Sequence, residues 1–272
     1  MNGPLTSTDV DDGTLGEQDV GSVRWLTISR ASVHNALNGS VLEELSAALD
    51  RVESTPSVRA VVVTGSGSRA FSAGADLDEL EGLDAAAAYQ VLESGGRVMR
   101  KLDKLPVPVI AAVNGLALGG GFELALACTF MVASTNAQFG FPETGLGLMP
   151  GYGGTQRLVR QLGDQAARAM ILTGSRIDAT TAREIGLLFL PPKPTDEFAS
   201  FVRELATRIA SCGPDATSRA LEALRLAGDV PLEAGLKAET LLASVCVGSN
   251  EAAVGIRAFR QRRQPEFTSR SM

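Results

Sequence analysis

The chain has 272 residues, and its hydrophobic content of 44% is sufficient for one sizeable buried core. Its net charge of −6 disfavours a nucleic-acid partner, which would require clustered Lys and Arg. A single histidine, His34, and three widely spaced cysteines provide few metal ligands, and we predict no metal site. Carboxylates therefore remain the main side chains for proton transfer.

The first 20 residues are polar and acidic. They have neither the basic start nor the apolar run of a secretory signal, and we predict that residues 1–20 form a disordered tail. No apolar run reaches the roughly 18 residues that a membrane-spanning helix requires, because residues 107–113 are followed by Asn114 and Gly115. We therefore predict a cytoplasmic protein with no membrane partner.

The first half of the chain predicts alternating strands and helices. Strands are expected over residues 23–30, where apolar and polar residues alternate, and over residues 58–65, a continuous apolar run. Helices are expected over residues 40–54 and 85–105, where apolar residues recur at helical spacing. A turn-rich segment lies between the second strand and the second helix, and we expect a helix to begin there near Ala75.

In the second half, strand, glycine loop and helix recur before the chain becomes helical. A buried strand is expected over residues 107–113, and short strands in MVAS and AQFGFPE precede a glycine-rich loop and a helix from about Thr155. Further helices are expected over residues 164–173, 179–186, 196–211, 214–227, 231–247 and 250–262. We therefore predict a mixed α/β core over residues 21–195 and a helical C-terminal region over residues 196–272.

Three consecutive glycines, Gly119 to Gly121, separate a predicted strand from a predicted helix. The first amides of a helix have no intrahelical partner, and glycines put no side chain between the backbone and a bound oxygen. The amides of Gly120 and Ala75 are therefore candidates for an oxyanion hole. Such a pair would stabilise charge on a carbonyl oxygen such as that of a thioester.

Two isolated glutamates accompany these amides. Glu123 lies in the first turn of the predicted helix, and Glu143 follows Pro142 at the end of a short strand with apolar neighbours. An apolar setting raises the pKa of a carboxyl group, so one glutamate could carry a proton while the other stays ionised. We therefore interpret Glu123 and Glu143 as candidates for a general acid and base.

Each of these features also has a purely structural interpretation. The glycines could permit close helix-on-strand packing, Glu123 could complement the helix dipole, and Glu143 could be a surface loop residue. The segment GLGLMPG does not have the glycine spacing of a dinucleotide-binding loop, so a nucleotide cofactor is not expected. No nucleophile motif accompanies His34, which favours a local hydrogen-bonding role.

Four segments, in order, resemble the crotonase superfamily, the enoyl-CoA hydratase/isomerase family, from about Val23 to Phe267. The family's first CoA-binding loop is similar to RASVHNALN, and its first oxyanion loop to AFSAGADLDEL. Its second oxyanion loop is similar to IAAVNGLALGGGFELALAC, and the segment with its second catalytic glutamate to FGFPETGLGLMPGYGGTQRL. Taken together, the chain is most similar to an enoyl-CoA hydratase.

The resemblance implies a spiral of strand-strand-helix repeats and a helical C-terminal region that forms a homotrimer, or a hexamer as a dimer of trimers. It also implies an acyl-CoA thioester as substrate, with CoA as part of the substrate and no separate cofactor. Thr129 stands where many members of the family have aspartate, which affects no catalytic position.

Carried over by position, the oxyanion amides are those of Ala75 and Gly120. Glu123 would activate water for attack at Cβ, and Glu143 would deliver a proton to Cα. Further contacts with CoA or the acyl group are implied for Val33, Ala36, Ala73, Asp76, Leu77, Gly151, Gly154, Phe259 and Arg262. Arg262 stands where lysine is usual, and a guanidinium can also bind a phosphate.

The favoured function is reversible hydration of a 2-enoyl-CoA to a 3-hydroxyacyl-CoA. One alternative is a 3,2-enoyl-CoA isomerase or another crotonase-type acyl-CoA lyase, for which the oxyanion hole would be the same. A second alternative is a non-catalytic acyl-CoA-binding or scaffold protein. Neither the acyl chain length nor the metabolic pathway follows from the sequence.

Overall fold

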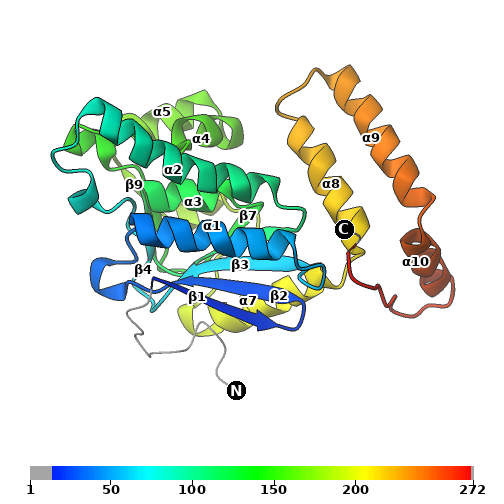
Figure 1. The fold of residues 1–272 in the computed structure, drawn as a ribbon. Coiled ribbons are helices and arrows are strands. Elements are labelled where there is room, and N and C mark those ends of the chain that lie inside the picture. Colours follow the sequence, from blue (N-terminus) through cyan, green and yellow to red (C-terminus); the bar gives the residue numbers. More distant parts are fainter. Residues whose placement is uncertain (1–13, 271–272) are drawn as a thin grey trace.

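A computed structural model describes residues 14–270, which contain two β-sheets (Figure 1). The first sheet has the order β1-β2-β3-β5-β7, formed by Leu15–Val20, Val23–Ile28, Ala60–Gly65, Val109–Val113 and Phe130–Ala133. Strand β1 is antiparallel to β2, and the other strands are parallel. All residues of β3 and β5 are buried, and neither strand has a charged side chain, as expected for parallel strands covered on both faces.

The second sheet has the order β4-β6-β8-β9. Its strands are Ala70–Ser72, Leu116–Leu118, Gln138–Gly140 and Arg176–Asp178. Each of β3, β5 and β7 in the first sheet is followed by one strand of the second sheet and then by a helix. The chain thus contains three strand-strand-helix repeats, which confirms the predicted mixed α/β spiral.

Ten α-helices lie within the described residues. They are α1 Gly39–Glu53, α2 Ala85–Lys104, α3 Gly120–Ala127, α4 Gly154–Leu162, α5 Asp164–Thr173, α6 Ala179–Glu184, α7 Thr195–Ala210, α8 Pro214–Leu226, α9 Leu232–Val247 and α10 Asn250–Arg260. Three short 3-10 helices accompany them, η1 Ala31–Val33, η2 Leu77–Glu79 and η3 Glu143–Leu146. These positions agree with the predicted helices to within a few residues.

The helix starts differ in how their first amides are satisfied. The side chain of Asn38 accepts a hydrogen bond from the Val41 amide at the start of α1, and Asp84 accepts one from Ala87 at the start of α2. Helix α3 instead follows Gly119, which has no side chain to act as a cap. The first amides of α3 therefore remain available to a ligand.

The hydrophobic core has two parts. The larger part lies between the two sheets and the helices that cover them, and includes Leu45 of α1, Met99 of α2 and Phe122 of α3. The smaller part lies on the other face of the first sheet, where Trp25 packs with Phe198 and other residues of α7. Both faces of the first sheet are therefore covered.

The predicted helical C-terminal region, residues 196–272, begins with a helix that packs on the core. Helix α7 contacts β2 and β3 and covers one face of the first sheet. Helices α8, α9 and α10 then extend away from the sheets (Figure 1). Helix α9 contacts α8 and α10, and none of its residues is buried in the single chain.

Two local predictions were wrong. Residues 15–20 form strand β1 rather than part of a disordered tail, because their backbone pairs with the whole of β2; residues 1–13 lie outside the described range. No α-helix begins near Ala75, because Asp76 caps only the short η2 and the next α-helix starts at Ala85.

Within residues 14–270, no helix has the length and apolar character that crossing a membrane requires.

Candidate active site

Two backbone amides from separate loops lie side by side at the start of α3. A Cβ built on Gly120 would be 3.2 Å from the nitrogen of Ala75, and one built on Gly74 would be 3.2 Å from the nitrogen of Gly120. Gly74 also has a φ of +109°, which side chains rarely tolerate. Within residues 14–270, neither the Ala75 amide nor the Gly120 amide donates a hydrogen bond to another protein group. Both are therefore available to an oxygen atom of a ligand, as predicted for an oxyanion hole.

The loop that carries Ala75 is fixed by its neighbour, the loop after β2. The amide of Leu37 donates to the oxygen of Gly74 at 2.8 Å, and the amide of Asp76 donates to the oxygen of Leu37 at 3.0 Å. The guanidinium of Arg30 adds two contacts of 2.9 Å, one to the Ala36 oxygen and one to the Asp76 carboxylate. The Ala75 amide is thus flanked on both sides by backbone hydrogen bonds.

Glu123 lies in the first turn of α3 and is 1% exposed. One of its carboxylate oxygens, Oε1, accepts hydrogen bonds from the amides of Tyr152 at 2.8 Å and Gly154 at 2.6 Å. Burial raises the pKa of Glu123, and the hydrogen bonds from Gly154 and Tyr152 oppose this shift. The carboxylate is therefore held in one orientation by the segment that precedes and begins α4.

Glu143 lies at the start of η3 and has a different environment. Its oxygen Oε2 is buried and has no hydrogen-bond partner. Burial, with a smaller contribution from the charge of Glu123, raises the pKa of Glu143 to about 7. A carboxyl group with this pKa can both donate and accept a proton near neutral pH.

Gly119 brings Glu143 next to the oxyanion amides. A Cβ built on Gly119 would be 2.8 Å from Oε1 of Glu143, and the φ of Gly119 is +50°. Only glycine fits both the conformation and the space. The carboxyl group of Glu143 therefore lies against the residue directly before Gly120.

The structure separates the predicted contact residues into three groups. The segments after β2 and after β4 contain five of them: Val33 and Ala36 follow β2, and Ala73, Asp76 and Leu77 follow β4. Val33 and Leu77 are 44% and 51% exposed, as residues at the mouth of a site would be. The Asp76 carboxylate, by contrast, binds Arg30 and caps η2.

The second group is Gly151 and Gly154. The amide of Gly154 holds Glu123, and a Cβ there would be 2.9 Å from Cγ of Glu123, so its role is to support the glutamate. Gly151 lines a separate cavity, described below.

Phe259 and Arg262 form the third group, and the structure does not bring them to the site within one chain. Phe259 belongs to α10 and is 84% exposed, and Arg262 follows the same helix. Helix α10 packs on α9, away from the sheets (Figure 1). The contact of Phe259 and Arg262 with the substrate therefore stays a prediction.

One residue that the sequence analysis did not select is Tyr152. Its backbone amide donates to Glu123, and its backbone oxygen accepts from Nη1 of Arg157 at 2.9 Å. The residue is only 4% exposed. Burial raises its pKa to about 12, so the phenol is neutral at physiological pH. The signal for Tyr152 was a single aromatic residue within GYGG, a run otherwise made of glycines.

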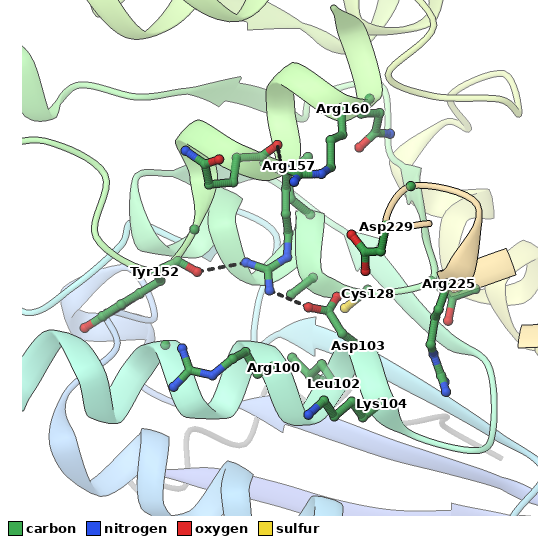
Figure 2. Close-up of a pocket in the computed structure, with 18 of the residues that line it drawn as sticks. Arg100, Leu102, Asp103, Lys104, Cys128, Tyr152, Arg157, Arg160, Arg225 and Asp229 are labelled. Atoms are coloured by element: carbon green, nitrogen blue, oxygen red, sulfur yellow. Dashed lines mark hydrogen bonds and ion pairs between the residues drawn. The ribbon is translucent and has the colours of Figure 1, made fainter. Parts of the chain in front are cut away.

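A cavity of about 1200 Å³ lies behind Tyr152, between α2, α4 and α8 (Figure 2). Its lining includes Leu92, Arg100 and Asp103. It does not include the glutamates Glu123 and Glu143 or the oxyanion residues Ala75 and Gly120. The side chain of Arg157 crosses the cavity wall and pairs with Asp103 (Figure 2). This cavity is thus lined by residues other than Glu123, Glu143, Ala75 and Gly120.

Comparisons with known proteins identify the family to which the chain is similar. The sequence model of the enoyl-CoA hydratase/isomerase family matches residues 18–270. The 2,3-dehydroadipyl-CoA hydratase of Escherichia coli is 40% identical over 91% of this chain and 96% of its own length. The short-chain-enoyl-CoA hydratase of Clostridium acetobutylicum is 37% identical over 90% of this chain and 94% of its own length.

The crystal structure of the enoyl-CoA hydratase from Bacillus anthracis superposes with a TM-score of 0.91. It is 36% identical in sequence, and the match covers 94% of this chain and 99% of that one. The family model, the curated relatives and the solved structure all extend over nearly the whole chain. The protein therefore belongs to the enoyl-CoA hydratase/isomerase family, the crotonase superfamily.

Proposed function

We propose that the protein catalyses the reversible addition of water to a 2-enoyl-CoA, giving a 3-hydroxyacyl-CoA. The observation that carries this proposal is the placement of two carboxyl groups beside two unpartnered amides. Glu123 is fixed by backbone donors, whereas Glu143 has a pKa of about 7 and an unpartnered oxygen. Hydration requires one group to take a proton from water and another to supply one to carbon.

In this reaction the thioester oxygen accepts hydrogen bonds from the amides of Ala75 and Gly120. Glu123 takes a proton from water as the water oxygen bonds to Cβ of the substrate. The electrons of the double bond move toward the thioester, and Glu143 gives its proton to Cα. The pair begins and ends with one proton, which returns from Glu123 to Glu143 before the next cycle.

The relatives support this choice over the alternatives. The names of the two curated relatives both specify hydration of an enoyl-CoA. A 3,2-enoyl-CoA isomerase needs only one carboxylate to move a proton between carbons, so the elaborate support of Glu123 would have no purpose there. A non-catalytic acyl-CoA-binding protein would need neither glutamate. CoA enters as part of the substrate, and the reaction uses no further cofactor.

We also propose that the chain assembles as a homotrimer, or as a hexamer of two trimers. Helices α8 to α10 expose apolar side chains in the single chain, including Leu224, Leu232, Leu241, Val247 and Phe259. A second copy that covers them would remove this surface from water. In such an assembly, Phe259 and Arg262 would meet the CoA of a neighbouring copy. The molar mass in solution tests this, with three or six times 28.3 kDa expected. The cytoplasmic location stays a prediction.

The direct test of the activity uses crotonyl-CoA and purified protein. Hydration removes the conjugation between the double bond and the thioester, and we expect the corresponding ultraviolet absorbance to fall. The product is then identified as 3-hydroxybutyryl-CoA by mass spectrometry. A folded protein that is inactive on short, medium and branched 2-enoyl-CoAs would contradict the proposal.

A further inference from the structure

The ring of Tyr152 fills the space between the oxyanion residue Gly120 and helix α2. A Cβ built on Gly120 would be 3.0 Å from Cε2 of the ring, and one built on Gly95 of α2 would be 2.3 Å from Cε1. The two edges of the ring therefore face two glycines on different helices. Any larger residue at Gly95 would collide with the ring, so the packing depends on both glycines.

The backbone of Tyr152 is held from two sides, which limits movement of the ring. Its amide donates to Glu123, and its oxygen accepts from Arg157, which also pairs with Asp103 of α2. The ring cannot leave its position by a shift of the loop without breaking one of these contacts. The backbone of Tyr152 is therefore restrained, and its buried ring packs against Gly95 and Gly120 as one wall of the active site.

Beyond this wall lies the cavity of about 1200 Å³ (Figure 2). Its surface nearest to Tyr152 includes Leu92 and Gly96 of α2 and Gly151. Leu92 also closes on the loop, because a Cβ built on Gly151 would be 2.7 Å from its Cδ2. The ring of Tyr152 thus separates the oxyanion hole from a cavity whose lining is apolar at Leu92 and charged at residues such as Arg100 and Asp103.

We propose that Tyr152 limits the acyl chain to short 2-enoyl groups, of about four to six carbons. This inference rests on the proposed function, which places Cα and Cβ of the substrate between Glu123 and Glu143 beside Gly120. The CoA part of the bound substrate would extend from this position toward the exposed loops of Val33 and Leu77. The remaining acyl carbons would then extend in the opposite direction, toward Tyr152. There they meet the ring, and each carbon that does not fit lowers the rate.

The test compares the wild-type protein with Tyr152→Ala and Tyr152→Phe on crotonyl-CoA and on 2-octenoyl-CoA. The Tyr152→Ala substitution removes the ring but keeps the backbone amide that holds Glu123. We expect it to raise the ratio of kcat/KM for the octenoyl over the crotonyl substrate about 10- to 100-fold. Tyr152→Phe keeps the ring and should keep the wild-type ratio.

Three results would overturn the inference. They are a wild-type protein that hydrates both substrates equally well, a Tyr152→Ala ratio within about twofold of wild type, and a Tyr152→Phe ratio that shifts as far as that of Tyr152→Ala. If Tyr152→Ala does not fold, Tyr152→Leu tests the same point with a smaller loss of volume, and it should shift the ratio in the same direction.

A binding measurement separates this inference from the proposed function. Calorimetry with butyryl-CoA and octanoyl-CoA, which cannot be hydrated, gives the same selectivity without turnover. Suppose that neither wild type nor any variant hydrates any substrate, but Tyr152→Ala gains affinity for octanoyl-CoA. The proposed function is then wrong, and the limit that Tyr152 sets on acyl chain length is confirmed. Suppose instead that wild type hydrates crotonyl-CoA, and that Tyr152→Ala changes neither the kcat/KM ratio nor the affinity ratio of the long over the short acyl chain. Tyr152 then does not limit the acyl chain, and the proposed function is retained.

Discussion

The environments of the two glutamates differ in almost every respect. Glu123 is buried in a helix and accepts two backbone hydrogen bonds on one oxygen. Glu143 is half-buried in a 3-10 helix and has one buried oxygen without a partner. In both residues burial raises the pKa, but only Glu123 has external backbone donors that oppose the shift.

This difference suggests a division of roles. A carboxylate that already accepts two hydrogen bonds is stabilised in its ionised form and is suited to orient and deprotonate water. A carboxyl group with a pKa of about 7 and few partners is suited to hold a proton and release it to carbon. The same residue type thus performs two tasks because the surrounding backbone differs.

The largest expected effect comes from Glu143→Gln. The amide has nearly the same shape but cannot release a proton to Cα, so we expect kcat for crotonyl-CoA hydration to fall about 10³- to 10⁴-fold. The circular dichroism spectrum and the melting temperature should remain close to wild type. A loss of less than about tenfold would remove Glu143 from the mechanism.

The second prediction concerns stability and contrasts Glu123→Ala with Glu143→Ala. Removal of the Glu123 carboxylate leaves the amides of Tyr152 and Gly154 buried without an acceptor, and should lower the free energy of unfolding by about 2–4 kcal/mol. Glu143→Ala removes no such acceptor and should cost less than about 1 kcal/mol. Glu123→Gln, which keeps an oxygen for both amides, serves as the control. Equal losses for both alanine variants, measured by urea unfolding, would contradict the comparison.

The third prediction uses two glycines with positive φ. Gly119→Ala would put a Cβ at 2.8 Å from the Glu143 carboxylate, whereas Gly147→Ala, at a φ of +72°, has open space around it. Both substitutions should cost about 1 kcal/mol of stability because of backbone strain. Only Gly119→Ala should also lower kcat/KM, about 10- to 100-fold, because it displaces the proton donor. Similar activities for the two variants would show that the position of Glu143 is not critical.

The fourth prediction is a pH profile. Hydration needs one proton on the glutamate pair, and since the pKa of Glu143 is raised to about 7, that proton is lost as the pH rises above this value. We expect kcat/KM to fall about tenfold per pH unit on the alkaline side. Because hydration consumes no net proton, dehydration of 3-hydroxybutyryl-CoA should show the same profile. Opposite profiles in the two directions would exclude a shared proton.

Much of the fold followed from the sequence because its elements are marked by strong local signals. The helix over residues 40–54 was predicted from regular apolar spacing, and α1 begins and ends within one residue of that range. Strand β1 was missed because its polar residues are exposed, and only pairing with β2 orders them. Pairing between strands is a tertiary effect that a single segment does not indicate.

In the candidate site, too, contacts within one segment were predicted from the sequence, whereas contacts between distant segments were not. Gly120 and Glu123 both lie in the first turn of α3, so one segment of sequence was enough to place them near each other. Ala75 was proposed as the second amide on the expectation of a helix start, and the structure places it beside Gly120 but in a loop before η2. The contacts of Glu123 with Tyr152 and Gly154 join positions about thirty residues apart, and no sequence pattern encodes them. Phe259 and Arg262 lie on and after α10, which packs on α9 rather than on the sheets, and their contact with CoA stays a prediction.

The central claim is that Glu143 moves a proton at Cα while Glu123 acts only on water. Exchange of the α-protons of butyryl-CoA in heavy water, followed by mass spectrometry, tests this directly, because butyryl-CoA cannot be hydrated. The account predicts that Glu123→Gln abolishes hydration of crotonyl-CoA but keeps exchange within about tenfold of wild type, whereas Glu143→Gln loses both. Exchange that survives in Glu143→Gln and disappears in Glu123→Gln would contradict it.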